Sequence, residues 1–327
     1  MDLYFDKENI TSFIDNREHE RYDDCFRVMQ KQLNLYFNFD KNELLNDEAL
    51  LAWFKFLTQG VGKQTKHFFL GNKFPERPLK SNTHTRLNSA QLSSIYLLND
   101  DRIEVCVNAG ALLIGKPGEE ISTISTLFLN QDDYSFDKKF KIGGNELSQW
   151  ADLKDYSFPV SDIIVVDSYI ACDTSLIDTN LIELIKILSI KSRCKINIIV
   201  YTNHEQTALT YEELSTKIRK GIESATGISP NFTLIKYRNQ RGIASFSEHD
   251  RTIFTNYNRM YSGDTFNYFL ADGTKTTKGR ELHYSNYGKK ENHNLALDLI
   301  NDIQNNISRM PNESIQGDKK SNFITFS

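Results

Sequence analysis

The chain has 327 residues and a mass of 37.8 kDa, which is enough for one large domain or two ordinary ones. Its formal charge of −4 and its pI near 6.0 exclude a uniformly basic, histone-like binder but leave room for a local basic face. Hydrophobic residues make up 39% of the chain and only six residues are proline, so the composition predicts a folded core and argues against long disordered regions.

The four cysteines are far apart and form no CxxC or CxxH pair. This spacing argues against a disulfide framework and against a zinc site, and no motif implies a metal or any other cofactor. The first residues lack a basic stretch followed by an apolar run, and no segment approaches the roughly 18 apolar residues that cross a bilayer. The sequence therefore predicts a cytoplasmic protein without a transmembrane segment.

Residues 1–150 are expected to form an α+β domain of unknown role. Apolar residues at helical spacing predict helices over 23–37 and 47–57. The composition of 91–98, 103–109 and 121–129 is typical of strands, and that of 72–88 is typical of a long loop. No motif in this half points to a chemistry, and a protein partner bound through it is one open alternative.

Residues 151–310 alternate between buried strands and amphipathic helices, which predicts an α/β domain with a mostly parallel sheet and flanking helices. Strands are expected over 162–169, 196–201, 232–237 and 252–256, and helices over 180–190, 210–226 and 294–308. Thr210 and Glu213 form a capping box at the start of the second helix, and Gly227 is placed to end it. Residues 311–327 are expected to be a polar, frayed tail.

One spaced pattern in this second half carries chemical information. It reads His249-x-Arg251-x4-Asn256-x6-Gly263-x3-Asn267. This spacing resembles the HxK-x4-D-x6-G motif of the phospholipase D superfamily, with Arg251 at the lysine position and Asn256 at the aspartate position. The earlier Asp167-Ser168-Tyr169-Ile170 resembles the D-P-Y-I strand end of the phospholipase D-like C-terminal domain of MIT-domain proteins, whose single H-D-R motif is also similar. The resemblance covers roughly residues 155–300.

The resemblance implies a phospholipase D-like fold and metal-independent phosphodiester chemistry without a cofactor. His249 would attack phosphorus to form a phosphohistidine, and Arg251 and Asn256 would complete the catalytic group. Arginine keeps the charge of the family's lysine but changes its geometry, and asparagine lacks the aspartate's carboxylate. Since the chain has no second motif of this spacing, turnover would require a homodimer that brings two copies of His249 together.

Further residues are expected to contact the ligand. Side chains two apart on a strand point to one face, so Arg251 would accompany His249, and the Ser262-Gly263 turn would let backbone N–H groups approach an anion. The expected ligand-binding residues are Asp167, Tyr169, Ser262, Gly263, Asn267, Lys275, Lys278 and Arg280. Two ordinary interpretations stay open: a His-x-Arg pair on a protein surface, and an Asp167 that only caps the following helix.

Local charge favours a partner that carries phosphate. Residues 236–291 contain ten basic and six acidic residues, whereas the rest of the chain has a negative net charge. Aromatic residues interleaved with these charges either stack on bases or pack between strands, and they are Tyr237, Tyr257, Tyr261, Phe266, Tyr268, Tyr284 and Tyr287.

Two functional hypotheses follow from the sequence. The first is a protein that binds a phosphodiester ligand, with nucleic acid foremost, at a degenerate phospholipase D-like site. If active, it would be a metal-independent nuclease, and the resemblance implies a place in a prokaryotic antiviral-defence or mobile-element system. The second is a non-catalytic module for a protein or a membrane surface, in which the α/β domain is scaffold and the N-terminal half carries specificity.

Overall fold

The computed structural model describes residues 1–59, 68–71, 93–99, 113–129, 134–192, 194–203, 207, 209–236, 251–276 and 279–326. The chain divides into two compact units. The first unit comprises Met1–Phe136 and Asn286–His293, and the second comprises Asp137–Ser285 and Asn294–Ser327. Residues 137–150, which the sequence assigned to the first domain, therefore pack with the second unit.

The first unit is built on a five-stranded sheet in the order β3-β2-β1-β4-β5. Every neighbouring pair in this sheet is parallel. The strands are β1 (Asp2–Phe5), β2 (Asn34–Phe37), β3 (Phe68–Phe69), β4 (Ile95–Leu97) and β5 (Leu113–Gly115). A wholly parallel sheet with helices between its strands is an α/β arrangement, so the predicted α+β class of this half is corrected.

Two predicted elements of the first unit differ in the structure. The helix expected over 23–37 is α2 (Tyr22–Lys31), and its last residues form strand β2 instead, because pairing with β1 and β3 places them in the sheet. The strand expected over 121–129 begins as helix α6 (Glu120–Ser125), where buried Ile121 and Ile124 lie three residues apart, as on one face of a helix. The segments 72–88 and 103–109 lie outside the described residues.

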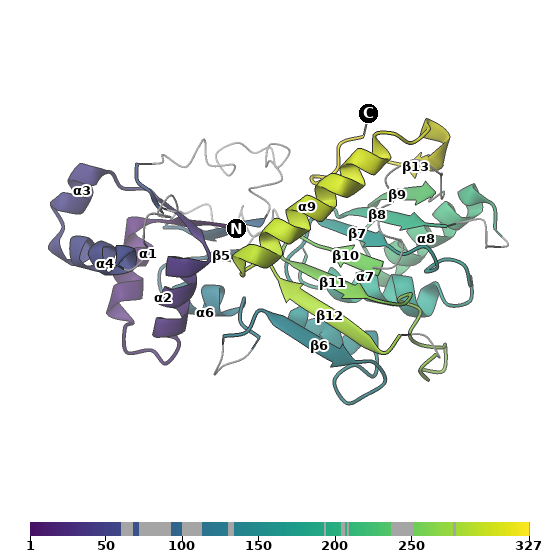
Figure 1. Ribbon diagram of the computed structural model, residues 1–327, viewed down its shortest axis with the longest axis horizontal. Helices are drawn as coiled ribbons and strands as arrows, with labels where there is room; N and C mark the ends of the chain where they lie inside the picture. Colours follow the sequence, from purple (N-terminus) through teal and green to yellow (C-terminus); the bar gives the residue numbers. More distant parts are fainter. Residues whose placement is uncertain are drawn as a thin grey trace. The chain divides into compact units, whose positions relative to one another are not determined.

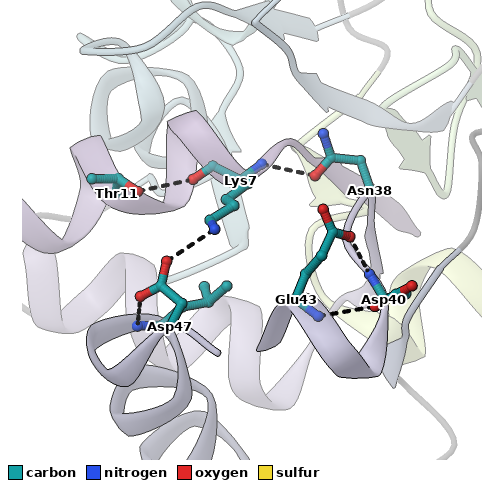
Figure 2. A network of polar contacts seen from close by, with 7 residues as sticks. Lys7, Thr11, Asn38, Asp40, Glu43 and Asp47 are labelled. Atoms are coloured by element: carbon teal, nitrogen blue, oxygen red, sulfur yellow. Dashed lines mark hydrogen bonds and ion pairs between the residues drawn. The ribbon is translucent and has the colours of Figure 1, made fainter. Parts of the chain in front are cut away.

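Lys7 joins the start of α1 (Lys7–Asp15) to two neighbouring segments (Figure 2). Its backbone N–H donates to Asn38 Oδ1 at 2.9 Å, and its Nζ is 2.9 Å from Asp47 Oδ2. Asp47 also caps α4 (Glu48–Thr58), the helix predicted over 47–57, by accepting the N–H of Leu50. A separate capping box of Asp40 and Glu43 opens α3 (Lys41–Leu45). Polar side chains thus order the loops that follow β1 and β2.

The second unit contains an eight-stranded sheet in the order β13-β9-β8-β7-β10-β11-β12-β6 (Figure 1). Its strands are β6 (Asp137–Lys141), β7 (Asp162–Val166), β8 (Asn197–Thr202), β9 (Asn231–Lys236), β10 (Arg251–Phe254), β11 (Asn258–Ser262), β12 (Glu281–Asn286) and β13 (Ile315–Gly317). Strands β7, β8 and β9 pair in parallel, whereas the β10–β7, β10–β11, β12–β6 and β13–β9 pairs are antiparallel. The sheet is mixed, which corrects the expected mostly parallel sheet.

Helices of the second unit connect and cover this sheet. The 3-10 helix η4 (Trp150–Tyr156) precedes β7. A π-helical turn (Asp178–Ile182) leads into α7 (Glu183–Leu188), and α8 (Tyr211–Thr226) joins β8 to β9. The predicted capping box is present, since Thr210 Oγ1 accepts the N–H of Glu213 at 3.2 Å, and Gly227 ends α8 with φ of 70°. Helix α9 (Lys290–Ile307) crosses in front of the sheet in Figure 1, and its Asn306 accepts a hydrogen bond from Tyr201 of β8.

The C-terminal segment is part of the fold. Strand β13 adds to the edge of the sheet beside β9, and the following chain returns to the start of β7. There the buried Asp162 accepts hydrogen bonds from Ser321 Oγ at 2.8 Å, Asn322 N at 2.7 Å and Asn322 Nδ2 at 2.6 Å. The tail predicted to be frayed therefore closes the second unit.

Candidate functional site

Three adjacent strands bring most of the predicted site residues to one end of the second sheet. Asp167 directly follows β7, and Arg251 is the first residue of β10. Thr252 pairs with Val166, so Arg251 lies beside Asp167, and Arg251 itself pairs with Ser262 at the end of β11. The turn after β11 then returns across the end of β7. We call Asp167, Tyr169, Arg251, Gly263 and Asn267 the Arg251 site.

Asp167 organises this site. Its side chain is buried, and its Oδ1 accepts the N–H of Tyr169 at 2.8 Å. Its Oδ2 accepts the Thr265 hydroxyl and the N–H of Phe266, both at 2.8 Å. Burial raises the pKa of Asp167, against the opposing effects of these hydrogen bonds and of the nearby Arg251 charge. Because both oxygens are engaged by the protein, Asp167 acts as a positioning residue that holds the 262–267 turn on β7.

Arg251 is partly exposed and is held in one orientation. Its Nη1 donates to the carbonyl oxygen of Gly263 at 3.1 Å. Its guanidinium carbon lies 5.4 Å from the centroid of the Tyr169 ring, within the range of a cation–π contact. Tyr169 itself is 41% exposed, so the site presents a cation and an aromatic ring together at the molecular surface. This pairing suits an anionic ligand with a planar group.

Gly263 leaves space beside Arg251. It is exposed, its φ lies outside the left-handed region, and a Cβ added there would meet no protein atom within 4 Å. The fold itself therefore does not require glycine at this position. Ser262 is different, because its hydroxyl is buried and donates to the carbonyl oxygen of Glu281 at 3.3 Å. Ser262 supports the turn, and Gly263 keeps its outer side open.

Asn267 contributes a buried acceptor. Its Nδ2 donates to the carbonyl oxygen of Tyr169 at 3.1 Å, which fixes the orientation of the amide, since a flipped amide would place two oxygens together. Its Oδ1 is buried without a hydrogen-bond partner among the residues that the structure describes. A buried acceptor of this kind costs free energy unless a donor reaches it.

Asn256 does not join this group, although its spacing from Arg251 placed it there. It lies beyond the far end of β10, where its Oδ1 accepts the N–H groups of Ser161 at 2.9 Å and Asp162 at 3.2 Å. Its Nδ2 donates to Ser161 Oγ at 3.1 Å. A four-residue strand, about 13 Å long at the usual rise, separates it from Arg251. The physical role of Asn256 is to secure the start of β7.

The other predicted contacts fall elsewhere. His249 and Lys278 lie outside the described residues. Lys275 and Arg280 are exposed on the chain between β11 and β12, and no contact joins either of them to Arg251 in the described structure. Thr265 is a site residue that the sequence analysis did not find, although the Ser-Gly-Asp-Thr turn after a strand is the kind of polar signal that marks such a position.

The described part of the chain contains no group of three or more His, Cys, Asp or Glu side chains placed to hold a metal ion. None of its helices is both long enough and apolar enough to cross a membrane. No protein-family model matches the chain, and a search of curated proteins finds no similar sequence. The geometry of the Arg251 site is therefore what supports a functional assignment.

Proposed function

We propose that the second unit binds a phosphodiester group of a nucleic acid at the Arg251 site. The observation that carries this proposal is the fixed orientation of Arg251, a partly exposed residue whose guanidinium is held between the Gly263 carbonyl and the Tyr169 ring. A guanidinium fork matches two phosphate oxygens, and such charge-assisted hydrogen bonds are among the strongest in proteins. The phospholipase D-like resemblance of 155–300 is part of the same proposal.

The surrounding residues favour a nucleotide over a bare phosphate. The exposed ring of Tyr169 offers a face on which a base stacks, and stacking of this kind tolerates any base. Inorganic phosphate has no planar group to stack on this ring.

Binding, rather than turnover, is the activity that the described residues support. Asp167 is occupied by three protein hydrogen bonds, and Asn256 serves the opposite end of β10. Neither residue is placed for proton transfer to a ligand beside Arg251. The site is therefore proposed as a degenerate one, and cleavage becomes an outcome of the test.

The test measures binding of fluorescein-labelled dinucleotide, single-stranded and double-stranded DNA by anisotropy, with chelator present. Arg251→Gln is expected to weaken binding at least tenfold, because hydrogen bonds to a charged group are lost. Lys220→Gln is the matched control, since it removes one exposed positive charge from α8. Arg251→Lys keeps the positive charge but lacks the paired N–H groups of the guanidinium. Its affinity is expected to lie between those of Arg251→Gln and the wild-type protein.

Three results would change the assignment. Wild-type protein that binds no nucleic acid overturns the proposal and favours a module for a protein or a membrane surface. Equal effects of Arg251→Gln and Lys220→Gln overturn the assignment of this site. Cleavage in chelator that disappears in His249→Ala would extend the function to a metal-independent nuclease.

A further inference from the structure

Strands β11, β12 and β6 carry a polar face that is separate from the Arg251 site. Along these strands buried and accessible residues alternate, as expected for a sheet with one solvated side. We call six of the accessible residues the β11–β12–β6 face, namely Arg259, Tyr261, Glu281, His283, Lys139 and Lys141, and the accessible Asp137 and Ser285 lie farther along the same side. In Figure 1, β12 and β6 lie beside the part of the sheet that α9 crosses.

Strand register places these side chains together and apart from Arg251. His283 pairs with Lys139, and Glu281 pairs with Lys141, so each pair shares one side of the sheet. Tyr261 and His283 stack, with ring centroids 4.6 Å apart and planes 22° apart. Arg251 pairs with Ser262, the neighbour of Tyr261, and successive strand residues point to opposite sides. The two groups therefore occupy opposite faces of the same hairpin.

The aromatic centre of this face is Tyr261. Of the aromatic residues that the sequence interleaves with basic ones, Tyr257, Phe266, Tyr268, Tyr284 and Tyr287 are at most 3% exposed. Tyr261 is the partly exposed member of that set within the described residues. The guanidinium carbon of Arg259 lies 4.4 Å from its ring centroid. Arg259, Tyr261 and His283 thus form a continuous run of planar groups across two strands.

The charged groups around these planar groups are three cations and two carboxylates, an excess of one positive charge. Arg259, Lys139 and Lys141 contribute three cations, while Glu281 is 3.5 Å from His283 Nε2 and Asp137 lies at the far end of β6. Planar groups flanked by cations are the arrangement by which proteins hold unpaired nucleotides, because bases stack on the rings and phosphates meet the cations. A duplex conceals its base faces within its own stack and gains less from such a surface.

We propose that the β11–β12–β6 face is the platform for a single-stranded nucleic acid, with bases stacked along Arg259, Tyr261 and His283 and phosphates on Lys139 and Lys141. This inference rests on the proposed function and names its substrate class as single-stranded DNA or RNA. The platform adds contacts for a longer strand, whereas the Arg251 site alone accommodates a dinucleotide.

His283 reports on this face directly. Burial lowers its pKa, the charges of Lys139 and Arg259 lower it further, and Glu281 opposes them. A base stacked on His283 would bury the imidazole and phosphates on this face would favour its protonated form, so strand binding is expected to shift the His283 imidazole resonances. Imidazole NMR resonances in a pH titration measure this shift in the intact chain.

The decisive experiment compares a labelled dinucleotide with a 12-nucleotide oligothymidine over a salt series. For the 12-mer, the double variant Lys139→Gln/Lys141→Gln is expected to lower the slope of log affinity against log salt by about 1.4, since each phosphate contact on a single strand contributes about 0.7. Tyr261→Leu is expected to weaken 12-mer binding about tenfold, whereas Tyr261→Phe retains it. The control Lys154→Gln/Lys220→Gln removes two exposed charges from η4 and α8.

The dinucleotide separates failure of the platform from failure of the proposed function. Both proposals are overturned if wild-type protein binds neither ligand. The platform alone is overturned if Arg251→Gln weakens both ligands while the lysine and Tyr261 variants bind the 12-mer like the control. Imidazole resonances of His283 that do not move in saturating 12-mer also overturn it, and this measurement needs no variant. Platform variants that affect duplex as strongly as single strand would contradict the assigned substrate class.

Discussion

Asp167 and Phe266 are ninety-nine residues apart in the chain and are joined by a hydrogen bond of 2.8 Å between a side-chain oxygen and a backbone N–H. The same oxygen accepts the Thr265 hydroxyl, also at 2.8 Å. Because the end of β7 is buried, these bonds form where water does not compete for them. They fix the turn that carries Gly263 and Asn267, so the geometry around Arg251 depends on a carboxylate that is not proposed to touch the ligand.

Replacing Asp167 by asparagine tests this dependence. The amide keeps one oxygen but turns an NH₂ group toward N–H or O–H donors, which leaves at least one buried donor unsatisfied. We expect Asp167→Asn to lower the free energy of unfolding by about 2 kcal/mol and to weaken dinucleotide binding. Urea denaturation and anisotropy measure the two effects. Asp298→Asn, at an exposed position on α9, is the control, and a stable Asp167→Asn with unchanged affinity would contradict the positioning role.

Asn256 is expected to behave as a structural residue. Removing its side chain leaves the buried N–H groups of Ser161 and Asp162 without their acceptor. We expect Asn256→Ala to lower the free energy of unfolding by about 2–4 kcal/mol, while the folded fraction binds nucleic acid like wild type. Denaturation followed by binding at a temperature where the variant is folded gives both values. A stable variant with weakened binding would instead place Asn256 in the ligand site.

The sequence predicted the parts of the fold whose signals are local. The sequence predicted β7, β8 and β9 because each is a short run of apolar residues. It predicted helix α8 because the residues of its capping box are only three positions apart. Strand β2 was missed because its residues continue the apolar spacing of α2, and only pairing with distant β1 and β3 decides against a helix. The mixed character of the second sheet depends on the direction of β10, which composition does not indicate.

The site was predictable to a similar extent. The spaced motif and the 167–170 strand end predicted that Asp167, Tyr169, Arg251, Gly263 and Asn267 lie at one site, and the structure brings these five together. The same spacing could not separate Asn256 from them, because a linear pattern does not reveal that a strand runs between two positions. Thr265 was missed since its partner is ninety-eight residues away.

The C-terminal segment is expected to stabilise the second unit. Asp162 is 1% exposed, and Ser321 and Asn322 supply three of the hydrogen bonds to its carboxylate. Deleting residues 319–327 leaves that buried charge with fewer donors, so we expect the free energy of unfolding to fall by about 3 kcal/mol. Asn322→Ala is expected to cost less, because the backbone N–H remains. Asn305→Ala, exposed on α9, is the control, and a truncated chain as stable as the full chain would refute the role of this segment.

The pKa of His283 is expected to respond to the charges on its own face. In the folded protein it is lowered by burial and by Lys139 and Arg259, so the native state binds fewer protons than the unfolded state just below pH 6.5. Stability is therefore lost as pH falls through this range. Lys139→Gln should raise the pKa of His283 and reduce that loss, whereas Glu281→Gln should lower the pKa further. Imidazole NMR titration, with His283→Asn to assign the resonance, measures both shifts, and a resonance indifferent to Lys139 would show that the two side chains do not share this face.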